Sequence, residues 1–472
     1  MTSALPQGWT WATVDDLGDY LNGMAFKPKD WTPEGTPIIR IQNLTDDSKP
    51  LNRTKRAYDQ KYGVTAGDLL VSWSATLDAF IWQREDAILN QHIFKVTPSG
   101  AVEARFLYYA LKEAIAELAA SEHLHGSTMK HINRGPFLAH ALPLPPLAEQ
   151  RRIVAKLDQV MARTARARAE LARIPALIAH HRRAVLAAAF KGELTADWRA
   201  SNPSLMSSAE LARVVLSARA KVTSAAIKAS FEPAAELDEL PEGWAWLPVD
   251  ALASKVVDGV HKKPTYVESG VPFLTVRNLT AGPGISFTGC RFVTPADHIE
   301  FVKRTNPENG DILVTKDGTL GTIRAIRTDA TFCIFVSLAL IKVVDRSMTD
   351  YLELALQSPA VQAQMVGVGS GLQHIHLVDL RQDMVPLAPP SERAEIVRRI
   401  QSAFTWLDKV AHEHAQATRL LDRLDQALLA KAFRGELVLQ DPTDEPAAAL
   451  LARIRAEREG AAPSVRKRKA RA

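Results

Sequence analysis

The chain contains the same unit twice, about 240 residues apart, and this duplication strongly limits the folds that it can adopt. Leu5-Pro6-Gln7-Gly8-Trp9 recurs as Leu240-Pro241-Glu242-Gly243-Trp244, an offset of 235. The Gly-Asp-Leu/Ile-Leu-Val motif at 67–71 recurs at 310–314, an offset of 243 that continues to the Phe-Lys/Arg-Gly-Glu-Leu motifs at 190–194 and 433–437. The difference predicts an eight-residue insertion after Leu279, in a loop of the second copy. Because solenoid repeats are only about 20–50 residues long, this period predicts a duplicated domain.

The first part of each copy has the pattern of a mixed α/β domain. Short apolar runs bounded by Gly, Pro, Asn and Asp are typical of strands. In the first copy these runs lie at 9–14, 38–42, 69–72, 79–82 and 88–96. Apolar residues at the 3.6-residue period predict a helix over 104–120, with a counterpart over 350–366.

A proline-rich segment and a long helical pattern follow in each copy. The prolines at 143–146 and 386–390 predict an extended exit, because proline disfavours helix in the residue before it. Beyond them, apolar positions alternate steps of three and four residues, which is a heptad seam. The seam positions are Ile153, Leu157, Val160, Thr164, Ala167, Leu171, Ile174, Ile178, His181 and Val185, and then Ile396, Ile400, Ala403, Leu407, Val410, His414, Ala417, Leu421, Leu424 and Leu428. Two such seams predict an antiparallel coiled coil with a break or kink at Pro175.

The net charge of +5 comes from the end of the chain. Five basic residues and no acid lie at 461–472, and without them the chain has 53 basic and 53 acidic residues. This tail is predicted to be disordered, so a polyanion partner would have to be bound by charges sorted onto faces of the folded part. Two cysteines and no secretory signal predict a cytoplasmic protein without disulfides, and the most apolar run, at 332–344, is too short for a membrane span.

Known catalytic signatures are absent from the sequence. It has no phosphate-binding Gly-x-x-x-x-Gly-Lys-Ser/Thr loop, no glycine-rich dinucleotide motif, no His-Glu-x-x-His and no amino-methyltransferase signature. The histidine groups His123/His125/His131 and His374/His376 suggest a metal or a nuclease, but they lack convincing carboxylate partners. No catalytic residue and no metal site is therefore predicted, and a binding protein is favoured.

The order of these features resembles the specificity (S) subunit of type I restriction–modification systems. The residues that carry the resemblance are the Leu-Pro-Leu-Pro-Pro-Leu-Ala-Glu-Gln segment at 142–150, the Phe-Lys/Arg-Gly-Glu-Leu motifs and the Gly-Ser-Thr-Met-Lys-His-Ile segment at 126–132. The second copy departs from the pattern with Arg393 in place of Gln150. The resemblance implies an α+β fold, with two similar α/β target-recognition domains separated by long helices in an antiparallel coiled coil, related by a pseudo-two-fold repeat.

The expected division of the chain follows this layout. It comprises target-recognition domain 1 at 1–145, a central spacer helix region at 146–199, a connector at 200–239, target-recognition domain 2 at 240–388, a distal spacer helix region at 389–437 and a C-terminal extension at 438–472. One helix is expected in the connector, over 209–221.

The resemblance also implies function and partners. Each domain would read one half of a bipartite, asymmetric site in double-stranded DNA, and the helices would set the spacing and dock two methyltransferase (M) subunits. These partners would methylate adenine N6 with S-adenosylmethionine, so no cofactor is expected on this chain. Restriction (R) translocase–nuclease subunits could join the complex.

Residues that distinguish two half-sites should differ between the copies and reach base edges with Arg, Lys, Asn, Gln or His. The candidates for DNA contact are Lys27, Lys29, Arg40, Gln42, Lys130, His131, His261, Lys262, Lys263, Lys316, Gln373, His374 and His376. The candidates for subunit docking on the helices are Arg151, Arg152, Ile153, Leu157, Ile396 and Ile400. Two alternatives stay open, a coiled-coil adaptor whose domains bind protein without DNA specificity and a nuclease that uses the histidines.

Overall fold

The computed structural model describes residues 5–120, 124–125, 131–203, 206–233, 236–262, 264–369, 371 and 373–461. The chain forms two compact units. Unit 1 comprises Met1–Leu171 and Gln416–Ala472, and unit 2 comprises Ala172–Ala415. Each unit therefore combines one globular domain with helical segments from both copies of the repeat, which is a different grouping from the linear division expected from the sequence.

The globular domain of unit 1 contains two four-stranded sheets. The strands of the first, in spatial order, are β2 (Gly18–Asn22), β9 (Ile93–Pro98), β6 (Leu69–Ser72) and β7 (Asp78–Ile81), all antiparallel. Those of the second are β4 (Asn52–Thr54), β3 (Thr36–Ile39), β8 (Ala87–Leu89) and β5 (Gly63–Val64). Helix α3 (Ala104–Ala120), which was expected, packs on the first sheet, and its buried face forms a core with β6 and β9.

Two strand predictions for this domain were wrong in their extent. The strand expected over 88–96 is two strands in different sheets, because His92 has a φ of 70° that interrupts the extended run. The strand expected over 38–42 ends at Ile39, and α2 (Ile41–Thr45) begins after Arg40. β2 and β4 were not predicted at all.

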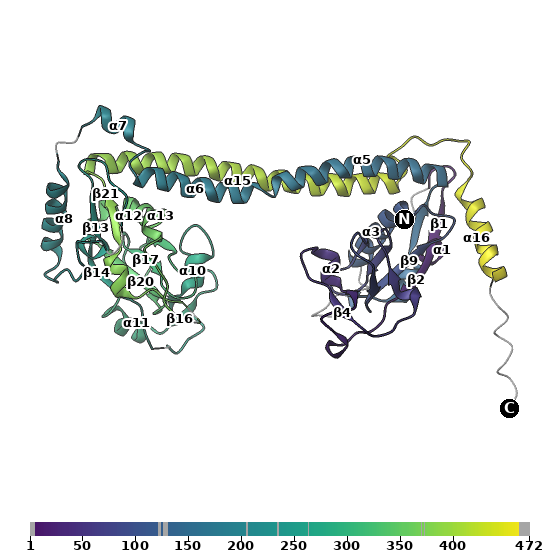
Figure 1. The fold of residues 1–472 in the computed structure, drawn as a ribbon, viewed down its shortest axis with the longest axis horizontal. Coiled ribbons are helices and arrows are strands. Elements are labelled where there is room, and N and C mark those ends of the chain that lie inside the picture. Colours follow the sequence, from purple (N-terminus) through teal and green to yellow (C-terminus); the bar gives the residue numbers. More distant parts are fainter. Residues whose placement is uncertain are drawn as a thin grey trace. The chain divides into compact units, whose positions relative to one another are not determined.

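The globular domain of unit 2 has the same two-sheet arrangement, but its second sheet has three described strands instead of four (Figure 1). Its first sheet has the order β14 (Ala253–Asp258), β20 (Leu338–Val343), β17 (Ile312–Thr315) and β18 (Ile323–Ala325). Its second has the order β16 (Arg291–Val293), β15 (Val271–Leu274) and β19 (Cys333–Ile334). The offset of 243 is not kept throughout, because Leu69 pairs with Val96 whereas Ile312 pairs with Ile341.

The helix expected over 350–366 is also corrected by the structure. It is two short helices, α12 (Thr349–Leu356) and α13 (Pro359–Gln362). Pro359 occupies the first position of α13, where its missing N–H and fixed φ suit the start of a helix and end the preceding one.

The eight-residue insertion of the second copy is divided between two places. Pro37 pairs with Arg53 and Pro272 with Phe292, so the offset between the copies is 239 at β4 and β16. Four extra residues therefore precede β16, and four follow it. The second group contributes to α11 (Pro295–Val302), where unit 1 has only the short η2 (Gln60–Tyr62). The prediction that the insertion lies in a loop is wrong for this second group.

The long helices pair antiparallel within each unit (Figure 1). In unit 1, Arg168 of α5 (Leu147–Leu171) contacts Asp422 and Asp425 of α15 (Pro390–Phe433) at 2.5 and 2.7 Å. In unit 2, Arg182 of α6 (Ile174–Phe190) contacts Asp408 of α15 at 2.5 Å. The expected break lies between α5 and α6, just before Pro175. No described helix combines the length and apolar character needed to cross a membrane.

The C-terminal end of each long helical region packs against the globular domain of the other copy. In unit 2, the Phe-Lys-Gly-Glu-Leu motif of the first copy meets the Leu-Pro-Glu-Gly-Trp segment of the second, and a Cβ on Gly192 would lie 2.3 Å from Cγ of Pro241. In unit 1, Gly435 stands in the same relation to Pro6, at 2.5 Å. Both glycines have a φ near +75°, the left-handed conformation that ends many helices and that side chains with a Cβ rarely adopt (Gly192 +78°, Gly435 +74°). The duplicated motif is thus an interlock between the copies.

The duplication extends into the segments expected to be a connector and a C-terminal extension. The expected connector helix is α8 (Ser208–Val222), and it packs on α9 (Val249–Leu252) and β13 (Ala245–Pro248) of unit 2. Its counterpart is α16 (Ala447–Ala461), which packs on β1 (Thr10–Thr13) of unit 1 and was not predicted. Arg219 donates to the carbonyl of Asp250 at 3.1 Å and Arg458 to the carbonyl of Asp15 at 2.8 Å, which are equivalent positions.

Candidate nucleic-acid interface

A buried glutamate at the start of each long helix fixes the globular domain to it. In unit 1, Trp9 Nε1 donates to Glu149 Oε2 at 3.0 Å, while Glu149 Oε1 is buried and has no partner. Burial raises the pKa of Glu149, and the hydrogen bond from Trp9 opposes this rise. In unit 2, the carboxylate of Glu392 accepts from Trp244 Nε1 at 2.8 Å, Thr195 Oγ1 at 2.7 Å and Arg199 at 2.6 Å. This tryptophan–glutamate hydrogen bond therefore joins the domain to its helix in the same way in both units.

The loops that follow β6 and β17 lie at equivalent places in the two domains but carry different chemistry. In unit 2, Lys316 follows β17 and is almost fully buried. Its Nζ lies 3.7 Å from Asp258 Oδ2, at the end of β14, and 3.8 Å from Asp317 Oδ1. Asp258 also binds the guanidinium of Arg304, and its Oδ1 lies 3.1 Å from His261 Nε2. One buried carboxylate thus gathers three cationic or protonatable side chains.

The electrostatics of this cluster favour an ionised Asp258. Burial would raise the pKa of its carboxyl, but hydrogen bonds from Arg304 and His261 outweigh this effect and hold the pKa below its ordinary value. Arg304 Nη2 also lies 3.1 Å from His261 Nε2. Because the side chains of Arg304 and His261 are 50% and 61% exposed, the cluster presents donors at the surface.

In unit 1, the residue equivalent to Lys316 is Trp73, at the end of β6. Its Nε1 donates to Asn22 Oδ1 at 3.2 Å, and its ring lies 4.7 Å from that of His92. These side chains belong to a largely aromatic site beside a cavity of about 330 Å³. The cavity is lined by Asn22, Trp73, Phe94, Ile132, Asn133 and Arg134. The described part of this domain has no carboxylate in the place of Asp258, which is occupied by the amide of Asn22.

The structure brings several predicted DNA-contacting residues to these two loops. His131 forms a β-bridge with Ser74, next to Trp73, and His374 forms the equivalent bridge with Asp317, next to Lys316. The rings of His374 and His376 are 4.5 Å apart, and the Gln373 carbonyl accepts a hydrogen bond from Gly318 N. Lys262 is exposed beside His261. Lys130 and Lys263 lie outside the described residues.

Other predicted residues of the first domain lie elsewhere. Lys27 and Lys29 are exposed at η1 (Pro28–Asp30), and Gln42 is exposed in α2. Arg40 is half-buried, donates to Asn52 Oδ1 at 3.2 Å and lies 5.2 Å from the ring of Trp31. They belong to the second sheet and its flanks, not to the Trp73 loop.

Four of the predicted docking residues are corrected by the structure. The side chains of Ile153, Leu157, Ile396 and Ile400 are fully buried in the cores of their own units, so they cannot meet a partner chain. These four seam residues pack each domain against the start of its long helix. Arg152 binds Asp444 at 2.6 Å within unit 1. Arg151 is exposed and is the only one of the six predicted docking residues without a described role inside its unit.

Sequence reasoning missed Asp258, Arg304, Trp73 and Asn22. The signal that could have found Trp73 was its alignment with Lys316, since both follow the Gly-Asp-Leu/Ile-Leu-Val strand. Arg304 lies in the part of the chain that the insertion lengthens, where no alignment between the copies helps. Among the described residues, no group of His, Cys, Asp and Glu is placed to hold a metal ion.

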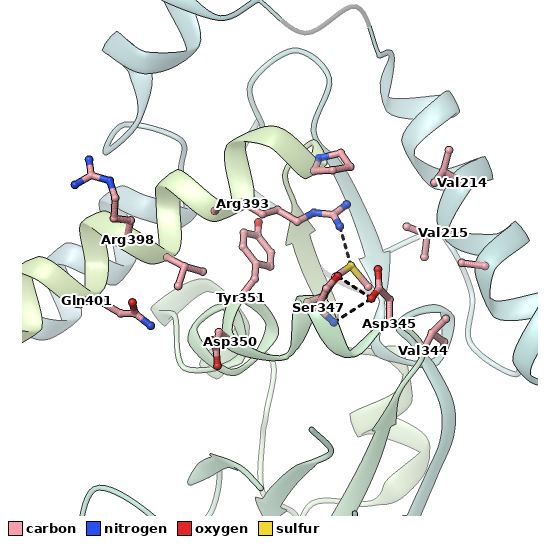
Figure 2. Close-up of a pocket in the computed structure, with 15 residues that line it drawn as sticks. Val214, Val215, Val344, Asp345, Ser347, Asp350, Tyr351, Arg393, Arg398 and Gln401 are labelled. Carbon is pink, nitrogen blue, oxygen red and sulfur yellow. Dashed lines mark hydrogen bonds between the residues drawn. The ribbon is translucent and has the colours of Figure 1, made fainter. Parts of the chain in front are cut away.

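A further cavity, of about 520 Å³, lies between α8, the segment from Val344 to Tyr351 and the start of α15 (Figure 2). Val214 and Val215 line it from α8, and Arg393 reaches it from α15. Burial lowers the pKa of Arg393, which donates to the carbonyl of Ala388 at 2.7 Å. Gln150, the equivalent residue in unit 1, instead binds the backbone at Ala101, Glu103 and Pro145. The exchange of Gln for Arg therefore keeps a role in holding the proline-rich exit.

Comparison with known proteins shows what this chain is similar to. The model for the type I restriction modification DNA specificity domain matches residues 6–176. The chain is 28% identical over 480 residues to the type I restriction enzyme EcoBI specificity subunit of Escherichia coli, which covers 96% of this chain and 93% of that one. It is 24% identical over 490 residues to the EcoKI specificity subunit of Escherichia coli strain K12, which covers 96% of both.

The fold of the chain is also similar to that of a solved structure. A chain from a solved structure described as "Structural basis underlying complex assembly and conformational transition of the type I R-M system" matches with a TM-score of 0.62 and 20% identity, over 92% of this chain and all of the other. Together with the duplicated motifs, the sequence matches show that the chain is similar, over almost its whole length, to specificity subunits of type I restriction–modification systems.

Proposed function

We propose that the chain is the sequence-specific DNA-binding subunit of a type I restriction–modification complex. The observation that carries the proposal is the contrast between the loops after β6 and β17. The two domains share their frame but place Trp73 and Asn22 in one loop region and Lys316 and Asp258 in the other. A protein that reads two different half-sites needs such a common scaffold with different reading residues, because phosphate contacts position a domain while base-edge contacts specify sequence.

Each domain is proposed to read one half of a bipartite, asymmetric site in double-stranded DNA. The helices α5, α6 and α15 are proposed to set the spacing between the halves. With 44 residues, α15 is about 66 Å long at 1.5 Å per residue, which is long enough to serve as a spacer. The candidate DNA contacts named above remain part of this proposal.

The chain is proposed to be non-catalytic, to dock two methyltransferase subunits and to join translocase–nuclease subunits in a larger complex. Methyl transfer to adenine N6 from S-adenosylmethionine would belong to the partners. On this chain, exposed apolar side chains of the helices suit docking better than the buried seam. Trp406, Leu420 and Leu177 expose 63%, 66% and 53% of their surface, respectively. Leu177 and Leu420 are equivalent positions of the two copies, as two docking sites for one kind of partner require.

The test is to map adenine methylation in cells with and without the gene, and to isolate the tagged chain with its methyltransferase. The proposal predicts that one bipartite motif loses methylation on deletion. If every methylated motif persists, the proposal fails. A titration of DNA binding across salt separates the adaptor alternative, because binding through phosphates weakens steeply with salt whereas an adaptor without DNA affinity gives no such dependence. Metal-dependent cleavage by the purified chain alone would instead favour the nuclease.

A further inference from the structure

The cluster around Asp258 has the construction of a base-reading site. Asp258 is buried, at 4% exposed, and lies at the end of β14, so its carboxylate is held by the sheet. It fixes the side chain of Arg304 twice, because Arg304 Nε donates to the Asp258 carbonyl at 3.2 Å and Nη2 donates to the carboxylate. Lys255 Nζ donates to the carbonyl of Arg304 at 2.7 Å and holds its backbone. A guanidinium held in this way has one orientation.

This orientation leaves part of the guanidinium available. The hydrogen bonds of Arg304 use Nε and Nη2, while Nη1 makes none among the described residues, and half of the side chain is exposed. His261 and Lys316 add positive or protonatable groups beside it, against the carboxylates of Asp258 and Asp317. The site therefore favours a ligand with hydrogen-bond acceptors over an apolar one.

Guanine matches these donors. In the major groove it presents two neighbouring acceptors, N7 and O6, and arginine is the commonest side chain that contacts them. A phosphate contact needs only a mobile positive charge, whereas a guanidinium anchored by a buried carboxylate has the fixed geometry that base recognition requires.

The described part of the first domain has no arginine held by a buried carboxylate at this place. Arg304 follows α11, which the insertion of the second copy lengthens, and the residue at the same offset in the first copy is Lys61, which pairs with Asp59 at the surface. The position of Asp258 is taken by Asn22, which faces Phe94 of β9 as Asp258 faces Ala339 of β20. The first domain therefore has neither the carboxylate nor the guanidinium of this pair, as expected if the two side chains act together on one half-site.

We propose that Arg304 recognises a guanine in the half-site of the second domain, and that Asp258 acts as its positioning residue. This inference rests on the proposed function, since it needs a DNA half-site for the second domain. It predicts that this half-site contains a G·C pair at which Arg304 discriminates.

The test uses the full chain with its methyltransferase partner and methylation mapping across a genome. Arg304→Ala should add methylated sites that differ from the parent motif at a single G·C pair of one half-site, with the other half unchanged. The loss of one arginine–guanine contact corresponds to a fall of about 10- to 100-fold in discrimination at that pair. Asp258→Asn should relax the same position less. Lys303→Ala is the matched control, because Lys303 is an exposed neighbour that pairs only with Glu300 and should leave the motif unchanged.

Newly methylated sites cannot arise from misfolding, which only removes methylation. A second measurement uses a DNA duplex with 7-deazaguanine at that position, which lacks the N7 acceptor. Binding of the wild-type complex should weaken about tenfold, and binding of the Arg304→Ala complex should not weaken further. The inference is overturned if the Arg304→Ala motif equals the parent motif, if all sites weaken uniformly as for a phosphate contact, or if methylation is lost entirely. Loss of every bipartite motif on gene deletion with an unchanged Arg304→Ala motif would overturn this inference alone and leave the proposed function intact.

Discussion

The two units of this chain are alike where the domain joins its helix and differ where the domain's first sheet ends. At the join, Trp9 and Glu149 of unit 1 correspond to Trp244 and Glu392 of unit 2, with bonds of 3.0 and 2.8 Å. At the end of the sheet, Trp73 of unit 1 corresponds to Lys316 of unit 2. Shared residues therefore build the scaffold, and unshared residues are free to determine what each domain binds.

The join itself is not perfectly duplicated. Glu392 has three partners, whereas Glu149 has one partner and one buried oxygen without any. The residues at the offset of 243 from Thr195 and Arg199 are Val438 and Pro442, which cannot donate side-chain hydrogen bonds to Glu149. The same buried carboxylate is thus stabilised well in one unit and poorly in the other.

The largest expected effect comes from substituting the buried glutamates, and it tests whether the two joins differ in stability. Glu392→Gln removes the charge that Arg199 pairs with and leaves a buried donor group facing other donors, so it should lower the free energy of unfolding by about 3–5 kcal/mol. Glu149→Gln keeps an acceptor for Trp9 and removes a buried charge with a raised pKa, so it should change stability by about 1 kcal/mol or less. Denaturant unfolding of both variants measures the difference. Equal losses would mean that the two joins are energetically the same.

The next largest effect is expected at the two glycines, Gly192 and Gly435. The same substitution should destabilise both units to a similar extent. Alanine at Gly192 or Gly435 would be strained by its positive φ and would meet Pro241 or Pro6, so each variant should lose about 1–3 kcal/mol. Gly282→Ala is the control, because nothing lies within 4 Å of a Cβ there. Thermal unfolding tests this, and a loss at only one of the two glycines would contradict the interlock in the other unit.

The effect that is smallest over a single pH unit is a pH dependence that belongs to unit 2 alone. Burial and, to a lesser extent, the nearby Asp379 together raise the pKa of Asp383 to about 7, while the equivalent residue of unit 1 is His140. Between the unfolded pKa near 4 and the folded pKa, the folded state holds a proton that the unfolded state has lost. Stability should therefore fall as pH rises from about 4 to 7, by at most about 1.4 kcal/mol per pH unit.

Asp383→Asn should remove most of this slope and raise stability at pH 8. Unfolding measured at pH 5 and pH 8 for both proteins checks the sign. A wild-type chain that gains stability with rising pH over this range, and an Asn variant that gains it equally, would show that Asp383 is not responsible.

Much of the fold could be predicted from the sequence, because repeated motifs and apolar periodicity depend on local spacing. The duplication, α3, α8 and the break before Pro175 are of this kind. Strand ends were less predictable, since a single residue such as His92 with φ 70° ends an extended run that its composition favours. The role of α16 was missed because packing on the other copy's domain is a tertiary contact that has no local signal.

The candidate site was predicted only in part for a similar reason. Exposed cations such as His261 and Lys262 can be found by residue type in Gly/Pro-flanked loops. Asp258 and Arg304, 46 residues apart, become partners only when β14 and the segment after α11 fold together. The seam residues Ile153 and Ile396 show the opposite error, because heptad spacing predicts an apolar face but does not say whether the chain's own domain covers it.

The central claim is that each domain reads its own half-site through the loop after β6 or β17. The most direct test maps methylated adenines in cells whose only copy of this gene encodes Trp73→Ala or Lys316→Ala. We predict that Trp73→Ala alters one half of the bipartite motif and Lys316→Ala alters the other, each with the remaining half unchanged. If both substitutions alter the same half, or if neither alters any position, the account of two readers on a shared frame is contradicted.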